Sequence, residues 1–149
     1  MEDELEQFRG LSLLLQHRAL VGRLDAIESA IAACQSSELS DAEMADRLLP
    51  LLRSFAAALP AHFAAESRSS ASLLRDCSDP EFARALAELD GQHPRLLAAF
   101  EGSVTQLAAC ASASSGVCHV SFEQAIAELL TAIGEFRSHE AREDALFAD

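Results

Sequence analysis

Several residue types are scarce or missing in this chain. It contains no tryptophan and no tyrosine, and only 5% of its 149 residues are aromatic. Without tyrosine, a tyrosyl-radical mechanism is excluded. Basic residues are also few, since 11 Lys and Arg stand against 24 Asp and Glu and leave a formal charge of -13. This charge argues against nucleic acid, anionic membrane surfaces and acidic substrates as partners, because all three would be repelled.

Paired cysteines and membrane-spanning runs are missing as well. The four cysteines (Cys34, Cys77, Cys110 and Cys118) form no C-x-x-C motif, and we expect them to be reduced thiols. No apolar run approaches the ~20 residues that a membrane span needs. The segment Met1–Glu6 is too acidic for a targeting signal. We therefore expect a soluble, cytoplasmic protein, either a monomer or a homodimer.

Helix-forming residues make up much of what is present. Half of the chain is hydrophobic, mostly alanine and leucine, and apolar positions recur with a helical period in four stretches. The expected helices cover about Asp3–Cys34, Asp41–Arg75, Pro80–Ala111 and Phe122–Ala148. No strand pattern competes. These features predict one all-α domain over residues 1–149, folded as an antiparallel up-down-up-down four-helix bundle.

Helix starts and interruptions can also be assigned. Ser40 with Glu43 forms a capping-box pattern, Ser78-Asp79-Pro80-Glu81 is a typical helix start, and Ser121 with Gln124 caps the last helix. Pro50 and Pro60 predict one or two kinks, or a short helix followed by a longer one. Gly91 and Pro94 interrupt the third stretch. The last loop is expected at Ser112–Val120.

Four of the five histidines follow a repeating pattern. His17 precedes His62 by 45 residues and His93 precedes His139 by 46, and a glutamate follows each second histidine after one turn, at Glu66 and Glu143. Each half of the chain therefore has the pattern H–(HxxxE). The two leading histidines also share a context, since a glutamine precedes each one and apolar residues follow at plus three and plus seven. This weak internal repeat predicts that each half supplies half of one site.

The spacing suits metal ligation. Residues four apart lie on the same helix face, about 6 Å apart between Cβ atoms, so His62 with Glu66 and His139 with Glu143 can each present an imidazole and a carboxylate to one point. His17 and His93 would complete two imidazoles per metal, and both glutamates could bridge. Mixed imidazole and carboxylate ligation with open positions favours iron or manganese over a closed structural zinc site. Zinc remains a substitute, whereas thiolate sites fit poorly.

Each residue also has a simpler interpretation. A lone histidine among leucines, such as His17, is more often a core histidine than a ligand, and an HxxxE pair is often a surface ion pair. The conjunction of two pairs with two further histidines on or beside apolar stripes favours the metal, because a buried charged glutamate needs a cation or strong donors. His119, beside Cys118, falls outside the pattern and is expected to be an exposed loop residue.

At this point the chain resembles the hemerythrin-like family of HHE cation-binding domains over almost its whole length. The sharpest likeness is the segment His139-Glu140-Ala141-Arg142-Glu143-Asp144-Ala145-Leu146-Phe147, which is similar to the family's H-x-x-x-E-[ED]-x-x-L-F ending. His62-Phe63-Ala64-Ala65-Glu66 resembles the second-helix ligand pair. Leu13-Leu14-Leu15-Gln16-His17 resembles the first-helix ligand, and His93 resembles the third.

The resemblance implies a non-haem centre of two iron ions with an oxo or hydroxo bridge. By this likeness His17 and His62 would hold one iron, His93 and His139 the other, and Glu66 and Glu143 would bridge them. It also implies binding or sensing of dioxygen, nitric oxide or peroxide. Two alternatives remain: an iron-responsive regulatory module without turnover, and a metal-free helical interaction protein.

The chain departs from the family's oxygen carriers on the third helix. Those carriers have two histidines one turn apart, whereas Leu89 and Leu97 flank His93 here. One iron would lack a ligand unless Asp90 or solvent replaced it, which argues against reversible oxygen carriage. Pro94 disfavours helical dihedrals at His93, so this ring either aims at the metal from a kink or points elsewhere. Glu140, about 100° around the helix from His139, is expected on the surface.

Overall fold

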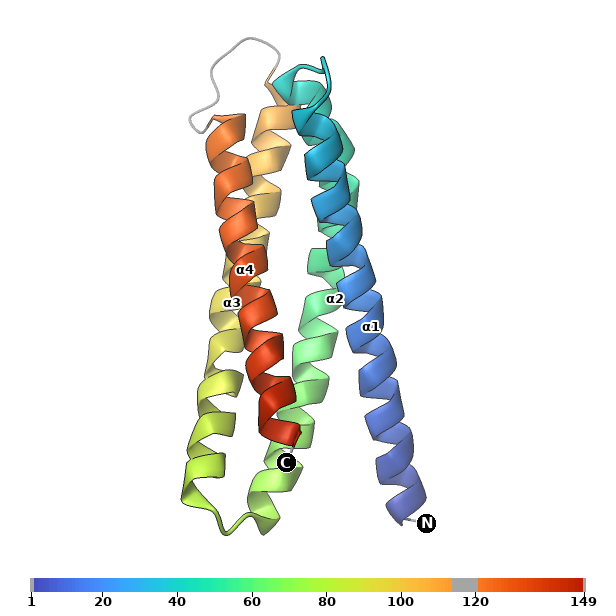
Figure 1. Cartoon of the computed structure of the whole chain (residues 1–149), viewed down its shortest axis with the longest axis vertical. Coiled ribbons are helices and arrows are strands. Elements are labelled where there is room, and N and C mark those ends of the chain that lie inside the picture. Colours follow the sequence, from blue (N-terminus) through green and yellow to red (C-terminus); the bar gives the residue numbers. More distant parts are fainter. Residues whose placement is uncertain (1, 114–120, 149) are drawn as a thin grey trace.

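Four α-helices account for nearly all of the chain. The computed structural model describes residues 2–113 and 121–148, and those residues contain no strand. The helices are α1 (Glu2–Gln35), α2 (Asp41–Asp76), α3 (Pro80–Ser112) and α4 (Phe122–Phe147). In Figure 1 the chain runs up α1, down α2, up α3 and down α4. The all-α class and the four predicted helices are confirmed.

The helix starts follow the local sequence. Ser40 Oγ accepts from the Glu43 amide at 3.2 Å, and the Ser40 amide donates to the Glu43 carboxylate at 2.8 Å, which completes the predicted capping box. Asp79 caps α3 and Ser121 caps α4 in the same way, through side-chain oxygens that accept from backbone amides of the first turn. The predicted loop 112–120 lies mostly outside the described residues, Cys118 and His119 included, and Ser112 itself ends α3.

The interior prolines do not divide their helices. Pro50 and Pro60 lie inside the continuous helix α2, and Pro94 lies inside α3. The expected alternative of a short helix followed by a longer one is therefore wrong. All three prolines are exposed, so water can hydrate the carbonyls that lose a helical partner. The opposite, buried faces keep both helices docked on the core.

The apolar core is built around three phenylalanines from three helices. The ring of Phe55 (α2) lies 4.8 Å from that of Phe100 (α3) and 5.4 Å from that of Phe136 (α4), between ring centroids. All three side chains are fully buried. Phe63 extends this cluster, because its ring centroid lies 6.3 Å from that of Phe136. The same Phe63 ring stacks on the His93 imidazole, with centroids 4.2 Å apart. The aromatic core therefore supports one side of the histidine cluster directly.

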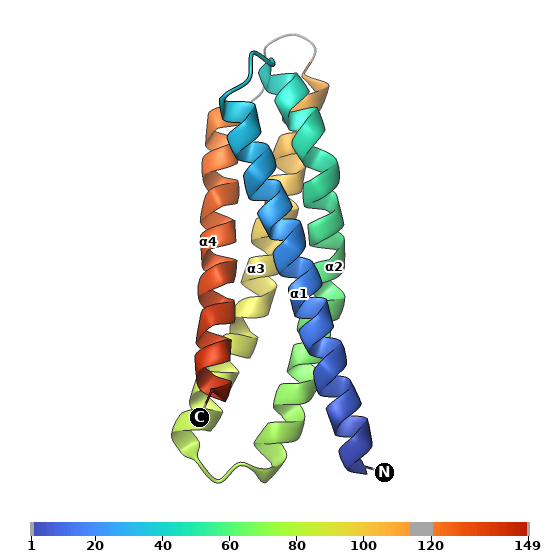
Figure 2. The ribbon, with the colours of Figure 1, turned by 45° about the vertical axis from the view of Figure 1, so that its right-hand side comes forward.

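Helix contacts are unequal around the bundle. α2 packs against both α1 and α3, and α3 packs against α4, whereas α1 and α4 make few close backbone approaches in the described residues. In Figures 1 and 2 the N-terminal end of α1 diverges from the C-terminal end of α4. The seam between these two helices is thus the loosest side of the bundle.

By length and composition alone, α2 could also cross a membrane. The core helix of a helical bundle can have the same length and apolar composition. α2 buries an imidazole and a carboxylate, those of His62 and Glu66, and a bilayer interior would oppose both. The helix is accounted for by its packing in the bundle.

Replacing the central phenylalanine should show how much the aromatic core contributes. We expect Phe55→Ala to lower the free energy of unfolding by about 3–5 kcal/mol, because it leaves a cavity between α2, α3 and α4. Leu130→Ala, at a side chain that is 42% exposed, is the control and should change it by less than about 0.5 kcal/mol. Urea unfolding followed by circular dichroism measures both, and equal losses would contradict this account of the core.

Candidate metal centre

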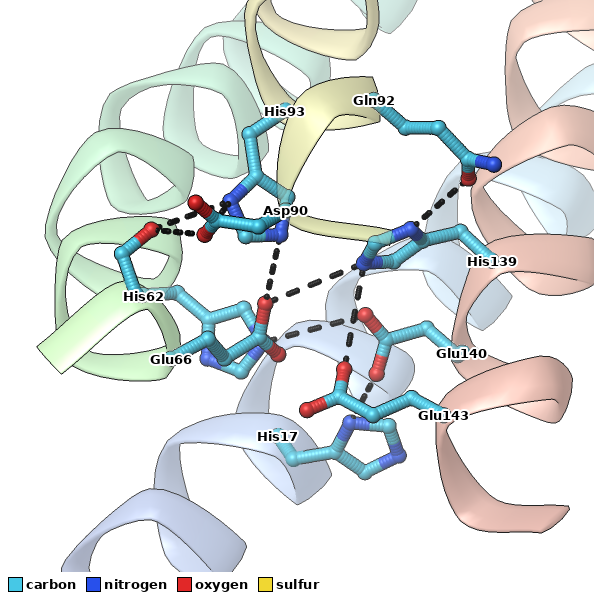
Figure 3. Close-up of polar contacts among 10 residues, drawn as sticks. His17, His62, Glu66, Asp90, Gln92, His93, His139, Glu140 and Glu143 are labelled. Carbon is cyan, nitrogen blue, oxygen red and sulfur yellow. Dashed lines mark hydrogen bonds and ion pairs between the residues drawn. The ribbon is translucent and has the colours of Figure 1, made fainter. Parts of the chain in front are cut away.

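All six residues predicted to bind metal meet inside the bundle. Figure 3 shows their side chains turned toward one another between the four helices. They are His17 from α1, His62 and Glu66 from α2, His93 from α3, and His139 and Glu143 from α4. His62, Glu66, His93 and His139 are buried, and His17 and Glu143 are partly exposed. The convergence follows from the i, i+4 pairs on α2 and α4, which face each other across the bundle.

Glu66 lies at the centre of this cluster and contacts imidazoles on two sides. Its Oε1 is 2.6 Å from His62 Nε2. Its Oε2 is 3.1 Å from His93 Nε2 and 3.8 Å from His139 Nε2. A carboxylate whose two oxygens face different nitrogen sets has the arrangement of a bridging ligand.

Glu140 belongs to the cluster, and the expectation that it lies on the surface is wrong. The residue is only 7% exposed. Its Oε2 makes a short contact with His17 Nδ1, and its Oε1 lies 3.8 Å from His62 Nε2. The signal was present in the sequence, because Glu140 is four residues after Phe136 and seven after Ile133, both buried. That spacing places it on the core-facing stripe of α4.

Potential ligand atoms gather into two overlapping clusters. The α1-side cluster contains His17, His62 and Glu140. The α3-side cluster contains Glu66, His93 and His139. Within each cluster the candidate donor atoms lie within 4.8 Å of one another, and Glu143 joins Glu66, His139 and Glu140 in a third group under the same limit. The two histidine pairs expected from the resemblance therefore fall into separate clusters.

Four nitrogen and oxygen atoms that face one another in this cluster, and that could bind a metal ion, have no hydrogen-bond partner among the described residues. They are His62 Nε2, Glu66 Oε2, His139 Nε2 and Glu140 Oε1, all inaccessible to water. The 2.6 Å approach of His62 Nε2 to Glu66 is close, yet it does not have hydrogen-bond geometry. Leaving buried polar atoms unpaired is costly. Donors that converge on a shared space without bonding one another fit a metal ion placed between them.

The electrostatics also favour a cation. Burial opposes charge on Glu66, but the close imidazoles of His139, His62 and His93 outweigh it and hold the pKa of Glu66 far below its usual range. Burial, reinforced by the negative charges of Glu66 and Glu140, raises the pKa of Glu143 from 4.5 to about 8.

The His62 ring responds in the opposite sense to its surroundings. Burial lowers its pKa, but the carboxylates of Glu140 and Glu66 outweigh burial and raise it from 6.5 to about 9. Without a metal, therefore, protons on His62 and Glu143 balance the crowded carboxylates. A divalent ion would supply the same positive charge.

Two outer partners orient the α3-side imidazoles. His139 Nδ1 lies 3.0 Å from Gln92 Oε1, which can only accept, so this contact places a proton on Nδ1 and leaves Nε2 as the ring nitrogen that could bind a metal ion. His93 Nδ1 lies 3.4 Å from Asp90 Oδ1, and Ser67 Oγ donates to the same carboxylate oxygen. Such partners fix the tautomer and direction of metal-binding histidines.

These contacts settle the local questions raised by Pro94 and Asp90. His93 stays inside the continuous helix α3 and directs Nε2 toward Glu66, so Pro94 does not turn it away. Asp90 faces the outer nitrogen of His93 and is absent from the candidate ligand groups among the described residues. It therefore does not lie where a direct metal ligand would. Gln92 and Asp90 contact the outer ring nitrogens of the candidate ligands His139 and His93. The sequence did not predict this role for either residue.

Comparison with known proteins assigns no family to this chain. No protein-family model matches it, and searches of curated proteins and of solved structures also find no match. The chemistry of the site therefore has to be inferred from its own residues, which offer four imidazoles and three carboxylates. This mixed set, with nitrogen and oxygen donors and no thiolate, suits iron, manganese or zinc.

Neutralising Glu143 should affect the metal-free and metal-loaded protein in opposite directions. Because its pKa is raised from 4.5 to about 8, the folded state favours the protonated carboxyl, and stability falls as the pH rises through that window. We expect Glu143→Gln to raise the melting temperature of the metal-free protein at pH 9 by a few degrees, and to change it little at pH 4. Metal affinity should fall by at least about tenfold.

Asp144→Asn is the matched control, because this neighbouring carboxylate is exposed. It should change neither quantity appreciably. Thermal melts at both pH values and calorimetric metal titrations make the comparison. Unchanged metal affinity in Glu143→Gln would remove Glu143 from the ligand set.

Proposed function

We propose that this chain is an antiparallel, hemerythrin-like four-helix bundle that binds two iron ions and binds or senses dioxygen, nitric oxide or peroxide. The carrying observation is the buried Glu66 carboxylate, whose Oε1 faces His62 and whose Oε2 faces His93 and His139. One carboxylate between two separate imidazole sets is the arrangement that two neighbouring metal ions require.

The donor set divides naturally between two ions. His17, His62 and Glu140 would hold one ion, and His93 and His139 the other. Glu66 would bridge, and Glu143 lies close enough to both Glu66 and Glu140 to bridge from the opposite side. A bound iron pair would supply redox chemistry and an open coordination position. The chain's own contribution is to orient the imidazoles, neutralise the ions and exclude water.

The carboxylate of Glu140 argues for redox chemistry or sensing over reversible oxygen carriage. The carriers have a further third-helix histidine, where this chain has Leu89 and Leu97. Here Glu140 of α4 would add an anionic donor, and it would do so at the ion held by His17 and His62 and not at the ion held by His93. An anionic oxygen donor stabilises a more highly charged metal ion better than a neutral imidazole does. We therefore infer that iron in this site favours the oxidised state.

Access to the site supports a small ligand. His17 and Glu143 are the most exposed members, with side chains 24% and 18% accessible, whereas His62 and His139 are at most 2% accessible. Both exposed members lie at the loose seam between α1 and α4. The partial exposure of these two side chains supports approach of a small molecule, such as a diatomic gas or peroxide, from this side of the site.

Metal analysis tests the proposal directly. Protein expressed in iron-rich medium should contain about two irons per chain, and its near-ultraviolet spectrum should show ligand-to-iron charge transfer that changes with azide or nitric oxide. Glu66→Ala and His139→Ala should lose this iron because each removes a buried donor. His119→Ala, at the one histidine outside the repeating sequence pattern, is the histidine control and should retain it. Manganese or zinc at two per chain would correct the metal, and background metal content would contradict the proposal.

A second candidate function is an iron-responsive regulatory module without turnover. It is favoured by the dependence of the α1-side cluster on the single α1 ligand His17. Iron removal should then lower the melting temperature strongly, while peroxide consumption stays at the level of the Glu66→Ala variant. Turnover in the wild type that disappears in Glu66→Ala would favour the enzyme instead.

A further inference from the structure

The two clusters of the site differ in how firmly the fold holds them. The α3-side cluster lies on α2, α3 and α4, and its side chains are 1–9% exposed. The α1-side cluster needs His17, whose side chain is 24% exposed. One cluster is thus formed by the packed part of the bundle, and the other is completed only by α1.

Outer contacts reinforce this inequality. Both imidazoles of the α3-side cluster have an outer partner, since His139 meets Gln92 and His93 meets Asp90. In the α1-side cluster, His62 Nδ1 is buried without a partner. A ligand whose ring is already fixed loses less conformational freedom when metal binds. The α3-side cluster is therefore the better prepared of the two.

The α1 ligand sits at the edge of the packed part of its helix. From Leu20 onward α1 contributes buried residues to the core. Before Leu20 none of the side chains that the structure describes is buried, and Leu11, Leu14 and Leu15 are 45–57% exposed. Arg137 of α4 pairs with Asp25 and Glu28, two turns or more beyond His17. Among the polar contacts of the described residues, the one between His17 and Glu140 is the only one that joins the part of α1 before Leu20 to α4.

We propose that the two metal positions fill in order, the α3-side cluster first and the α1-side cluster second, and that the second ion fixes the first half of α1 against the bundle. This inference rests on the proposed two-metal function, and it adds that metal occupancy regulates the position of the first half of α1. Each preformed outer contact strengthens metal binding by about 10–100-fold. The first ion should accordingly bind at least about tenfold more tightly than the second.

If the two positions fill in order, the concentration of available metal would decide whether the part of α1 before Leu20 is fixed against the bundle. With one ion bound, His17 keeps its contacts with Glu140 and with the His62 ring, and α1 is held from Leu20 onward. With two ions bound, a metal–nitrogen bond joins α1 to ligands from α2 and α4. The exposed side chains of Leu11, Leu14 and Leu15 are then held in a fixed position relative to the other helices. The second ion therefore controls the position of this apolar surface on the molecule.

Anaerobic Fe²⁺ titration of the metal-free full-length protein tests the order. Calorimetry should resolve two steps of one ion each in the wild type. His17→Ala should keep the tight step unchanged and lose the weak one, leaving one iron per chain. Asp90→Asn, which removes no ligand, should weaken the tight step by about 10–100-fold. His119→Ala should behave as wild type.

Hydrogen exchange of the α1 backbone gives an independent readout. Amides in residues 7–18 should gain protection only with the second equivalent of iron, and should not gain it in His17→Ala at any loading. Amides in residues 20–34 should change little in either protein and serve as the internal control.

The outcomes separate this inference from the proposed function. A wild type that binds no metal overturns the proposed function and this inference together. Two ions taken up in one unresolved step, loss of both ions in His17→Ala, or α1 protection by the first equivalent would overturn the ordered filling alone. An unchanged tight step in Asp90→Asn would also count against it.

Discussion

The buried charge of Glu66 is the constraint on which this structure depends. A carboxylate inside a hydrocarbon bundle costs several kcal/mol unless cations or strong donors surround it. The fold meets that cost by bringing His62, His93 and His139 within 3.8 Å of its two oxygens. Because these imidazoles come from three helices, the charge can be balanced only when α2, α3 and α4 are packed together. The site and the bundle therefore stabilise each other.

Aromatic packing connects this polar centre to the apolar core. Phe63 stacks on the His93 ring and meets the His139 ring edge-on, with centroids 5.8 Å apart in the second pair. It also reaches Phe136, with centroids 6.3 Å apart. These rings limit how the imidazoles can turn and keep water from one side of the site. On the opposite side, where α1 meets α4, the side chains that the structure describes form no comparable aromatic layer, and the partly exposed His17 and Glu143 lie there.

Much of the architecture could be predicted from local sequence. Caps at Ser40, Asp79 and Ser121 set three helix starts, because each places a side-chain oxygen beside free amides of a first turn. The pairs His62 with Glu66 and His139 with Glu143 could be identified because residues four apart share a helix face whatever the fold. Proline was a poorer guide, since Pro50, Pro60 and Pro94 lie on exposed faces of unbroken helices.

The sequence by itself determined the helices, their order and six of the side chains that meet at the candidate metal centre. These features depend on residue spacing within each helix. Tertiary structure alone decided the inward rotation of Glu140, the outer contacts of Asp90 and Gln92, and the partly exposed position of His17. Each of these depends on how far one helix is rotated or tilted against another. That geometry is set by the packing of whole surfaces, which no spacing within a single helix specifies.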